Sequence, residues 1–328
     1  MMLSVIIPCF NDHDNVSKQL DRLSNVLDHY DIEIIVIDDA STESDIDLLT
    51  PHKECFGERL VLLRNAQNMG PGPTRNVGIE NAHGTYVCFL DSDDILDDAF
   101  FFYVEEIIRD HSFDVAVFKY HFQDAEDAPY SFKMSPIDET LWDRLEAHGG
   151  GGQVKALWQV PFMIMQVNYP WNKIYRRELL IRHNIRFPKL ALHEDIPFHW
   201  ISMMLAERLF FALEYPPLYI HNRLPGRDRA TDKADSRRFQ LLDASAQTLD
   251  CIASYEHLRM FYPIFLRFFF DVWGWVDGIL PEGLKADFRT QAQSMCRAYY
   301  KGDVLNYLQS TDHDVAERLK EFLGDEAP

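Results

Sequence analysis

The sequence predicts an α/β protein with a mostly parallel central sheet, followed by a helical C-terminal region. Over roughly the first 125 residues, short apolar runs of strand length alternate with amphipathic helical stretches. After Pro225 the pattern is mostly helical to the end of the chain. The strand candidates are apolar along their whole length, so we expect βαβ units and a sheet that is buried on both faces.

The individual elements follow from these runs and from the breaks between them. Before residue 125, the predicted strands are 3–7, 33–37, 60–63, 86–90 and 114–119, and the predicted helices are 15–30 and 74–82. Later in the chain, a further helix is expected over 194–206.

Two later segments are compositionally unusual. Residues 123–152 are polar, contain prolines and end in four glycines at 149–152, whose ordering costs much entropy, so we expect a flexible loop or hinge there. Residues 257–280 are dense in aromatic side chains but are interrupted by Arg267 and Asp271, which argues against a membrane span. A buried helix is our main interpretation, and a membrane-surface or dimer face is the alternative.

The charge balance excludes some partners. The 328 residues carry 32 Lys and Arg against 52 Asp and Glu, a formal charge of −20 that disfavours nucleic acid as a partner. Basic residues nevertheless gather in 173–189 and 223–238, which we interpret as local phosphate sites. The five cysteines form no Cys-x-x-Cys pair, so no zinc site or disulfide framework is expected. The chain opens on a strand rather than a signal peptide, so we expect a cytoplasmic protein.

Two acidic clusters follow predicted strands, at the edge of a parallel sheet where ligands bind. Asp38 and Asp39 come after 33–37, where they either form a turn or accept hydrogen bonds from a nucleobase or ribose. Asp91 and Asp93 come after 86–90, and their mutual repulsion favours a bound Mg²⁺ or Mn²⁺ that would bridge to substrate phosphates. The next residue, Asp94, is expected to cap a helix that starts near Ile95.

A Gly/Pro loop at 68–76 supports the same site. It opens into the predicted helix 74–82 and places Arg75 in the first turn, where free N–H groups and a guanidinium can bind an anion. The loop contains neither Gly-Lys-Ser/Thr nor Gly-x-Gly-x-x-Gly, so a P-loop and a dinucleotide fold are disfavoured.

Four segments in this order, 4–11, 35–42, 75–79 and 84–94, resemble the blocks of family 2 glycosyltransferases of the GT-A fold. The resemblance is strong over roughly residues 3–100. Segments 171–179 and 193–198 are similar to the Asn-Lys-x-Tyr and Glu-Asp-x-x-Phe segments of bacterial members, which commonly build surface polysaccharides. The resemblance implies a nucleotide-sugar-binding region at 1–125 and an acceptor and catalytic region of the same domain at 126–222. The helical pattern predicts a C-terminal extension at 223–328, which shows no such clear match.

The resemblance also implies roles for individual residues. The catalytic base would be Asp195, which Glu194 would orient unless Glu194 itself binds the acceptor; the alternative is two acids that merely favour a helix N-terminus. Mn²⁺ or Mg²⁺ would be held by Asp93 and Asp91. The donor nucleotide would be bound by Pro8, Asn11, Asp38 or Asp39, Arg75, Asp91 and Ser92.

Further contacts to the diphosphate or the acceptor are expected later in the chain. His221, Arg227 and Arg229 would close over the diphosphate, although a solvated basic turn explains them as well. Lys173 would contact substrate, and Trp171 would stack on a sugar unless it belongs to the core.

The predicted function is therefore an inverting, metal-dependent glycosyltransferase. Its donor would be a nucleotide-diphosphate sugar, a UDP-sugar by default, and its acceptor a saccharide or a lipid-linked saccharide. The C-terminal helices would supply a peripheral inner-membrane or homo-oligomer contact. Two alternatives stay open: a non-catalytic glycosyltransferase-like scaffold, and a sugar-nucleotide pyrophosphorylase, which the absence of a Gly-rich loop after the first strand disfavours.

Overall fold

The computed structural model describes residues 2–42, 45–123, 133–223 and 233–324. It divides into two compact units. The first unit comprises residues 1–189 and 198–227 and contains the strands, whereas the second comprises 190–197 and 228–328 and is helical.

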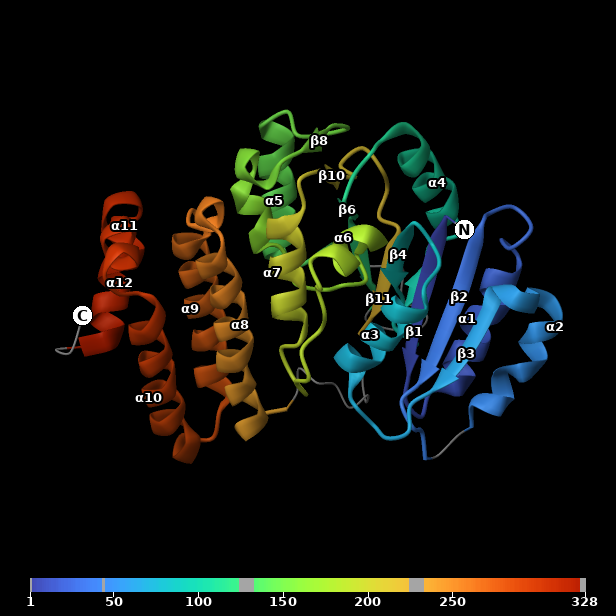
Figure 1. Cartoon of the computed structure of the whole chain (residues 1–328), viewed down its shortest axis with the longest axis horizontal. Coiled ribbons are helices and arrows are strands. Elements are labelled where there is room, and N and C mark those ends of the chain that lie inside the picture. Colours follow the sequence, from blue (N-terminus) through green and yellow to red (C-terminus); the bar gives the residue numbers. More distant parts are fainter. Residues whose placement is uncertain (1, 43–44, 124–132, 224–232, 325–328) are drawn as a thin grey trace. The chain divides into compact units, whose positions relative to one another are not determined.

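An eight-stranded sheet forms the centre of the first unit (Figure 1). Its strands are β1 (Leu3–Cys9), β2 (Ile32–Asp38), β3 (Leu60–Arg64), β4 (Tyr86–Phe89), β6 (Val115–Val117), β8 (Val154–Lys155), β9 (Lys173–Arg176) and β10 (Leu209–Phe211). The order is β3-β2-β1-β4-β9-β6-β10-β8. The first four strands pair in parallel, β9 is antiparallel to both of its neighbours, and β8 is antiparallel to β10. The mostly parallel sheet predicted from the apolar runs is thus confirmed.

Helices cover both faces of the parallel half of the sheet, which explains why its strands are apolar throughout. Alternate side chains of β1 and β2 form a core with α1 (His13–Ser24) and α4 (Phe100–Asp110). The intervening side chains meet α3 (Pro71–Asn81), which packs so closely that Gly78 lies against Ile6. Strand β3 lies where the sequence predicts it. Helix α3 begins three residues before the predicted 74, at Pro71, and α1 ends six residues earlier than predicted, at Ser24 rather than Tyr30.

A smaller three-stranded sheet has the order β5-β11-β7. It consists of β5 (Ile95–Leu96), β11 (Tyr219–Asn222) and β7 (Tyr120–Gln123). The expectation that a helix starts near Ile95 with Asp94 as its cap is therefore wrong. Ile95 instead pairs with Ile220 of β11, and the next helix, α4, begins only at Phe100.

The remaining helices of the first unit include one that the sequence analysis missed. Helix α5 (Pro136–Ala147) lies within the segment expected to be a polar loop; Ser135 caps it, Pro136 opens it, and the amide N–H groups of Gly149 and Gly150 donate to carbonyls of its last turn. The other helical segments are α2 (Lys53–Phe56), α6 (Arg177–Arg182), η1 (Ile46–His52), η2 (Gly57–Arg59), η3 (Leu157–Gln159) and η4 (Pro161–Met165).

Helix α7 (Asp195–Leu205) carries its first turn in the second unit and the rest in the first. The second unit otherwise contains α8 (Gln240–Ser254), α9 (Phe261–Ile279), α10 (Glu282–Tyr299), α11 (Asp303–Thr311), α12 (His313–Leu323), η6 (Ser236–Phe239) and η7 (Glu256–Leu258). Most aromatic side chains of α9 are buried, which supports the buried-helix interpretation; Trp273 is half-buried and Trp275 is 43% exposed. No helix in the described part of the chain is both long and apolar enough to cross a bilayer.

The close approach of α3 to β1 generates a prediction about stability. A Cβ at Gly78 would lie 2.3 Å from Cγ2 of Ile6, so Gly78→Ala must displace core side chains. We expect a loss of about 1–3 kcal/mol in the free energy of unfolding, measured by urea denaturation. Gly274→Ala in the middle of α9, where a Cβ meets nothing within 4 Å, is the control and should be neutral or slightly stabilising. Equal effects of the two variants would contradict the packing described here.

Candidate active site at the carboxyl edge of the sheet

Parallel pairing brings the carboxyl ends of β1, β2 and β4 to one edge of the sheet, where their loops are joined. The N–H of Asp39 donates to the Cys9 carbonyl at 2.8 Å, and the N–H of Asn11 donates to Ser41 Oγ at 2.8 Å. Asn11 and Ala40 both have left-handed backbone conformations, with φ of 53° and 59°. The half-buried Pro8 stands at the end of β1, beside these loops. This edge therefore holds two ordered turns side by side.

Asp38 is fully buried and stabilises the turn after β2. Its carboxylate lies 2.7 Å from Nη1 of Arg64 and accepts hydrogen bonds from the N–H and the hydroxyl of Ser41, the former at 3.0 Å. Nε2 of His13 lies 3.7 Å from the same carboxylate. The protein itself thus supplies several partners to Asp38.

Asp39 orders the loop that leads into α3. Its carboxylate accepts hydrogen bonds from the N–H of Met69 at 2.9 Å, the N–H of Gly70 at 2.8 Å and Nδ2 of Asn65 at 2.8 Å. Gly70 has a φ of 86°, a conformation that other residues rarely adopt, and α3 begins at the next residue. The Asp39 carboxylate therefore fixes where α3 starts.

Helix α3 in turn brings Arg75 to the acidic cluster after β4. Nη2 of Arg75 lies 2.6 Å from Oδ1 of Asp91, with side-chain exposures of 7% and 25% respectively. The guanidinium also lies 5.5 Å from the ring centroid of Phe187. Two residues that the sequence analysis assigned to the donor site are thus in direct contact, and part of the Asp91 carboxylate faces solvent.

Ser92 and Asp93 complete the loop after β4. Ser92 Oγ donates to Asp12 Oδ2 at 2.6 Å, which ties the loop to the segment that follows β1. Asp93 is half-buried, and its backbone carbonyl accepts a hydrogen bond from the side chain of Asn222. Within the described ranges, no group of three or more His, Cys, Asp or Glu side chains is placed to hold a metal ion.

Asp94 is a structural centre that the sequence analysis did not identify. Its buried carboxylate accepts hydrogen bonds from Tyr219 Oη at 2.9 Å and the Asn222 N–H at 2.8 Å, and Nδ1 of His221 lies 2.9 Å away. Burial, together with the charges of Asp91 and Asp93, raises the pKa of Asp94 to about 6. Burial would lower the pKa of His221, but its hydrogen bond with Asp94 outweighs that effect and raises it. Asp94 thus joins β11 to the acidic loop.

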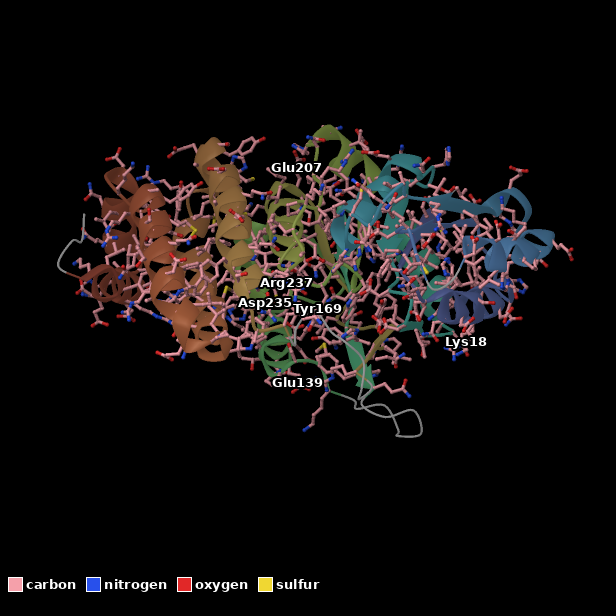
Figure 2. All side chains as sticks on the ribbon, turned by 90° about the horizontal axis from the view of Figure 1, so that it is seen from below. Lys18, Glu139, Tyr169, Glu207, Asp235 and Arg237 are labelled. Atoms are coloured by element: carbon pink, nitrogen blue, oxygen red, sulfur yellow. The ribbon has the colours of Figure 1, made fainter. Side chains whose placement is uncertain are left out.

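Of the residues expected to close over the diphosphate, His221 lies beside the acidic loop after β4, because its Nδ1 contacts the Asp94 carboxylate. Arg227 and Arg229 lie outside the described residues. Farther along the second basic segment, Arg237 forms an ion pair with Asp235 at 2.6 Å, and Figure 2 shows the two side by side.

Trp171 and Lys173 are both enclosed. The ring of Trp171 is 4% exposed and stacks with those of Tyr169 and Tyr219, with centroids 4.6 and 4.3 Å away. Lys173 is 1% exposed, and its ammonium donates to the carbonyls of Val167 and Tyr169 at 3.3 and 2.8 Å. Both side chains thus lie in the core: Trp171 packs within a stack of aromatic rings, and Lys173 binds the carbonyls of the segment before β9.

The two candidate catalytic acids, Glu194 and Asp195, belong to the second unit and are both half-buried. Asp195 is the first residue of α7. His193 precedes them with a left-handed backbone, φ 65°. Burial, with the charge of Arg238, lowers the pKa of His193 to about 3.

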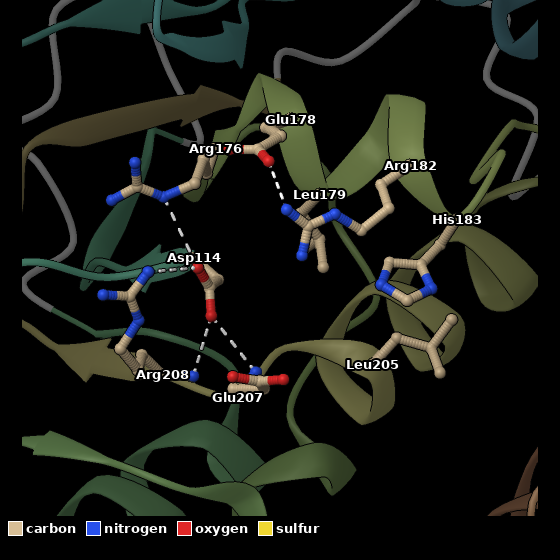
Figure 3. A pocket seen from close by; sticks show the side chains of 9 residues that line it. All are labelled: Asp114, Arg176, Glu178, Leu179, Arg182, His183, Leu205, Glu207 and Arg208. Carbon is tan, nitrogen blue, oxygen red and sulfur yellow. Dashed lines mark hydrogen bonds and ion pairs between the residues drawn. The ribbon is translucent and has the colours of Figure 1, made fainter.

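A separate cavity of about 110 Å³ lies at the opposite, amino-terminal edge of the sheet (Figure 3). Arg176 and Arg208 converge there on Asp114, with N–O distances of 3.4 and 2.9 Å, and Arg182 pairs with Glu178. The basic residues of segment 173–189 were expected to form a phosphate site. Because three carboxylates, those of Asp114, Glu178 and Glu207, line the cavity together with these three arginines, we do not assign an anion site to it.

The position of Asp94 predicts a strong effect of its removal. Asp94→Ala leaves the buried hydroxyl of Tyr219 and the half-buried N–H of Asn222 without their acceptor, so the free energy of unfolding should fall by at least about 2 kcal/mol, as measured by urea denaturation. The matched control is Asp98→Ala, in an exposed position of the same segment, which should change stability by no more than about 0.5 kcal/mol. A loss at Asp94 no larger than that at Asp98 would contradict the structure.

The lowered pKa of the half-buried His193 predicts acid sensitivity. Its pKa is about 3 in the folded protein against an ordinary 6.5, so below pH 6.5 the unfolded chain binds a proton that the folded chain does not. Stability should therefore fall as the pH is lowered from about 6.5 towards 3. His193→Asn, which retains a side chain that tolerates left-handed backbone, should make the thermal midpoint less dependent on pH in this window. The exposed control His257→Asn should follow the wild type, and an unchanged profile for His193→Asn would refute the assignment.

Comparison with known proteins places this chain in a family. Residues 4–183, more than half of the chain, match the model of glycosyl transferase family 2. The chain is 28% identical over 226 residues to a poly(ribitol-phosphate) beta-glucosyltransferase of Bacillus spizizenii, covering 68% of this chain and 33% of that protein. It is also 28% identical over 189 residues to the putative glycosyltransferase EpsH of Bacillus subtilis, covering 57% and 50%. The chain thus spans half or less of the length of these relatives.

A solved structure extends the likeness along the chain. TarS 1–349 of S. aureus in complex with UDP-GlcNAc matches with a TM-score of 0.74 at 20% identity, covering 98% of this chain and 89% of that one. Since the match covers nearly all of the chain, the shared fold includes the C-terminal helices. The chain therefore belongs to glycosyl transferase family 2, and its α/β unit has the GT-A-like fold.

Proposed function

We propose that this protein is an inverting glycosyltransferase that moves a sugar from a nucleotide-diphosphate donor to a hydroxyl group of a saccharide or lipid-linked acceptor. The observation that carries the proposal is the contact of Arg75 with Asp91 at the carboxyl edge of the sheet, next to the turns after β1 and β2. A guanidinium, a partly exposed carboxylate and a helix N-terminus at one edge suit a sugar nucleotide, which carries both phosphates and hydroxyl groups.

Of the two aspartates after β2, we propose Asp39 as the one that contacts the base. Asp39 is 3% exposed and accepts hydrogen bonds from the Asn65 side chain and from the N–H groups of Met69 and Gly70. Asp38 is fully buried and committed to Arg64 and Ser41. Pro8, Asn11 and Ser92 would line the remainder of the nucleotide site.

Asp91 and Asp93 fit a divalent cation that binds together with its substrate. Mg²⁺ is usually held by one or two carboxylates plus substrate phosphates, and two half-buried carboxylates are available here. Such a site needs no third protein carboxylate. When bound, Mn²⁺ or Mg²⁺ would neutralise the charge that develops on the departing diphosphate.

In this proposal Asp195 is the general base, and Glu194 orients it or binds the acceptor. The acceptor oxygen attacks the anomeric carbon of the donor sugar while its proton passes to the Asp195 carboxylate. The bond from that carbon to the diphosphate oxygen breaks, and the nucleoside diphosphate leaves with the electron pair. A single displacement of this kind inverts the configuration at the anomeric carbon.

The substrates follow by analogy with the relatives. TarS was solved with UDP-GlcNAc and with UDP, which supports a UDP-sugar as the donor. The Bacillus spizizenii relative is named for a poly(ribitol-phosphate) acceptor, which supports a role in surface polysaccharide synthesis. A non-catalytic scaffold is the second candidate, and turnover separates the two.

The proposal predicts a specific pattern of donor binding and turnover. Wild type, Asp93→Ala and Asp195→Asn would be titrated with UDP-, GDP- and dTDP-sugars by calorimetry, with Mn²⁺, Mg²⁺ or EDTA, and donor hydrolysis would be followed. We expect one donor to bind only with metal and Asp93→Ala to weaken binding at least about tenfold. Asp195→Asn should bind the donor normally but lose about 10²- to 10⁴-fold in turnover.

Asp98→Asn, an exposed change of the same kind, is the control and should behave as the wild type. If no nucleotide sugar binds under any metal condition, the enzyme proposal fails and the scaffold takes its place. If Asp195→Asn turns over at the wild-type rate, the assignment of the base is wrong.

A further inference from the structure

The segment that carries the two candidate catalytic acids is held by the helices of the second unit. Residues 190–197 belong to that unit although the chain on both sides of them belongs to the first. The N–H groups of Ala191 and Leu192 both donate to Oε1 of Gln240, at 2.8 and 3.0 Å. Gln240 is the first residue of α8. One side-chain oxygen thus ties two consecutive residues of this segment to a helix 48 residues farther along the chain.

A second group of contacts surrounds His193, immediately before Glu194. Nη1 of Arg238 lies 3.5 Å from Nε2 of His193, and the Arg238 guanidinium lies 4.5 Å from the ring centroid of Trp275 on α9. The Trp275 ring meets that of His193 edge-on, at 6.4 Å. Arg238 is 2% exposed, and its Nε donates to the Lys233 carbonyl at 2.7 Å. The histidine ring is therefore enclosed by side chains from η6 and α9.

These contacts matter because of the backbone at His193. A left-handed conformation at a residue other than glycine costs of the order of 1 kcal/mol and persists only where its surroundings impose it. The His193 carbonyl then accepts the N–H of Ile196 at 3.3 Å, within the first turn of α7. The direction in which Asp195 leaves the backbone is thus set by a turn that the second unit holds in place.

We propose that Gln240 is a positioning residue for Asp195: by accepting the N–H groups of Ala191 and Leu192 it holds the turn from which the general base projects. This inference rests on the proposed function. It gives the C-terminal helices a role in the reaction itself, since α8 supplies Gln240 and α9 supplies Trp275. Displacing a catalytic group by about 1 Å can cost on the order of 100-fold in rate, so one hydrogen-bond acceptor outside the site can have a large effect.

The experiment compares two substitutions that differ in one acceptor oxygen. Gln240→Met keeps the length of the side chain and removes the acceptor, whereas Gln240→Glu keeps an acceptor oxygen. Gln247→Met, at an exposed position on the same helix, is the matched control. The full-length variants are assayed for kcat and for the KM of the donor, with the donor and metal that serve the wild type, beside Asp195→Asn. Amide hydrogen exchange of the peptides covering residues 190–194 is measured by mass spectrometry on the same proteins.

We expect Gln240→Met to lower kcat by about 10- to 100-fold, with the donor KM within about twofold of wild type. It should also speed amide exchange in 190–194, whereas Gln240→Glu and Gln247→Met should leave both quantities near wild type. The inference is overturned if Gln240→Met retains wild-type kcat, or if Gln240→Glu loses as much kcat as Gln240→Met. A wild type that transfers no sugar refutes the proposed function instead. In that case, if Gln240→Met leaves amide exchange in 190–194 unchanged, the role of Gln240 in holding this segment is overturned as well.

Discussion

The parallel pairing of β1 with β2 and with β4 is the constraint on which the candidate site depends. Cys9 of β1 is in register with Asp38, and Ile6 with Phe89, so three loops leave the sheet at one edge. A slip of one residue would turn every side chain of a strand to the opposite face, and these strands are packed on both. Burial of the strands thus sets the register, and the register sets which acidic side chains meet.

The aspartates at this edge divide into two kinds. Asp38, Asp39 and Asp94 are buried, and each is held by backbone N–H groups or by side chains that approach from elsewhere in the chain. Asp91 and Asp93 are only half-buried. The buried carboxylates would be costly without their partners, so their contacts fix the loops, and Asp91 and Asp93 are the more exposed acids of this edge. The acidic cluster therefore combines structural and chemical roles among neighbouring residues.

The sequence predicts the parallel sheet and assigns Arg75 and Asp91 to one site, because apolar strands and the residues that follow them are local signals; their direct contact is seen only in the structure. It does not predict the role of Asp94, whose partner Tyr219 lies 125 residues away. Helix α5 has readable start signals in Ser135 and Pro136, but it lies in a segment whose polar composition is typical of a loop, so the composition alone does not predict it. The link from Gln240 to Ala191 depends on tertiary packing, which no local pattern records.

The most direct test of the account is where a nucleoside diphosphate binds. Crystals soaked with UDP and Mn²⁺ would be examined for an anomalous manganese peak and for nucleotide density. We predict manganese between the diphosphate and the carboxylates of Asp91 and Asp93, with the base beside Asp39. Nucleotide density at the opposite edge of the sheet, around Asp114 and Arg176, would contradict the account, as would fully occupied nucleotide without metal at Asp91 and Asp93.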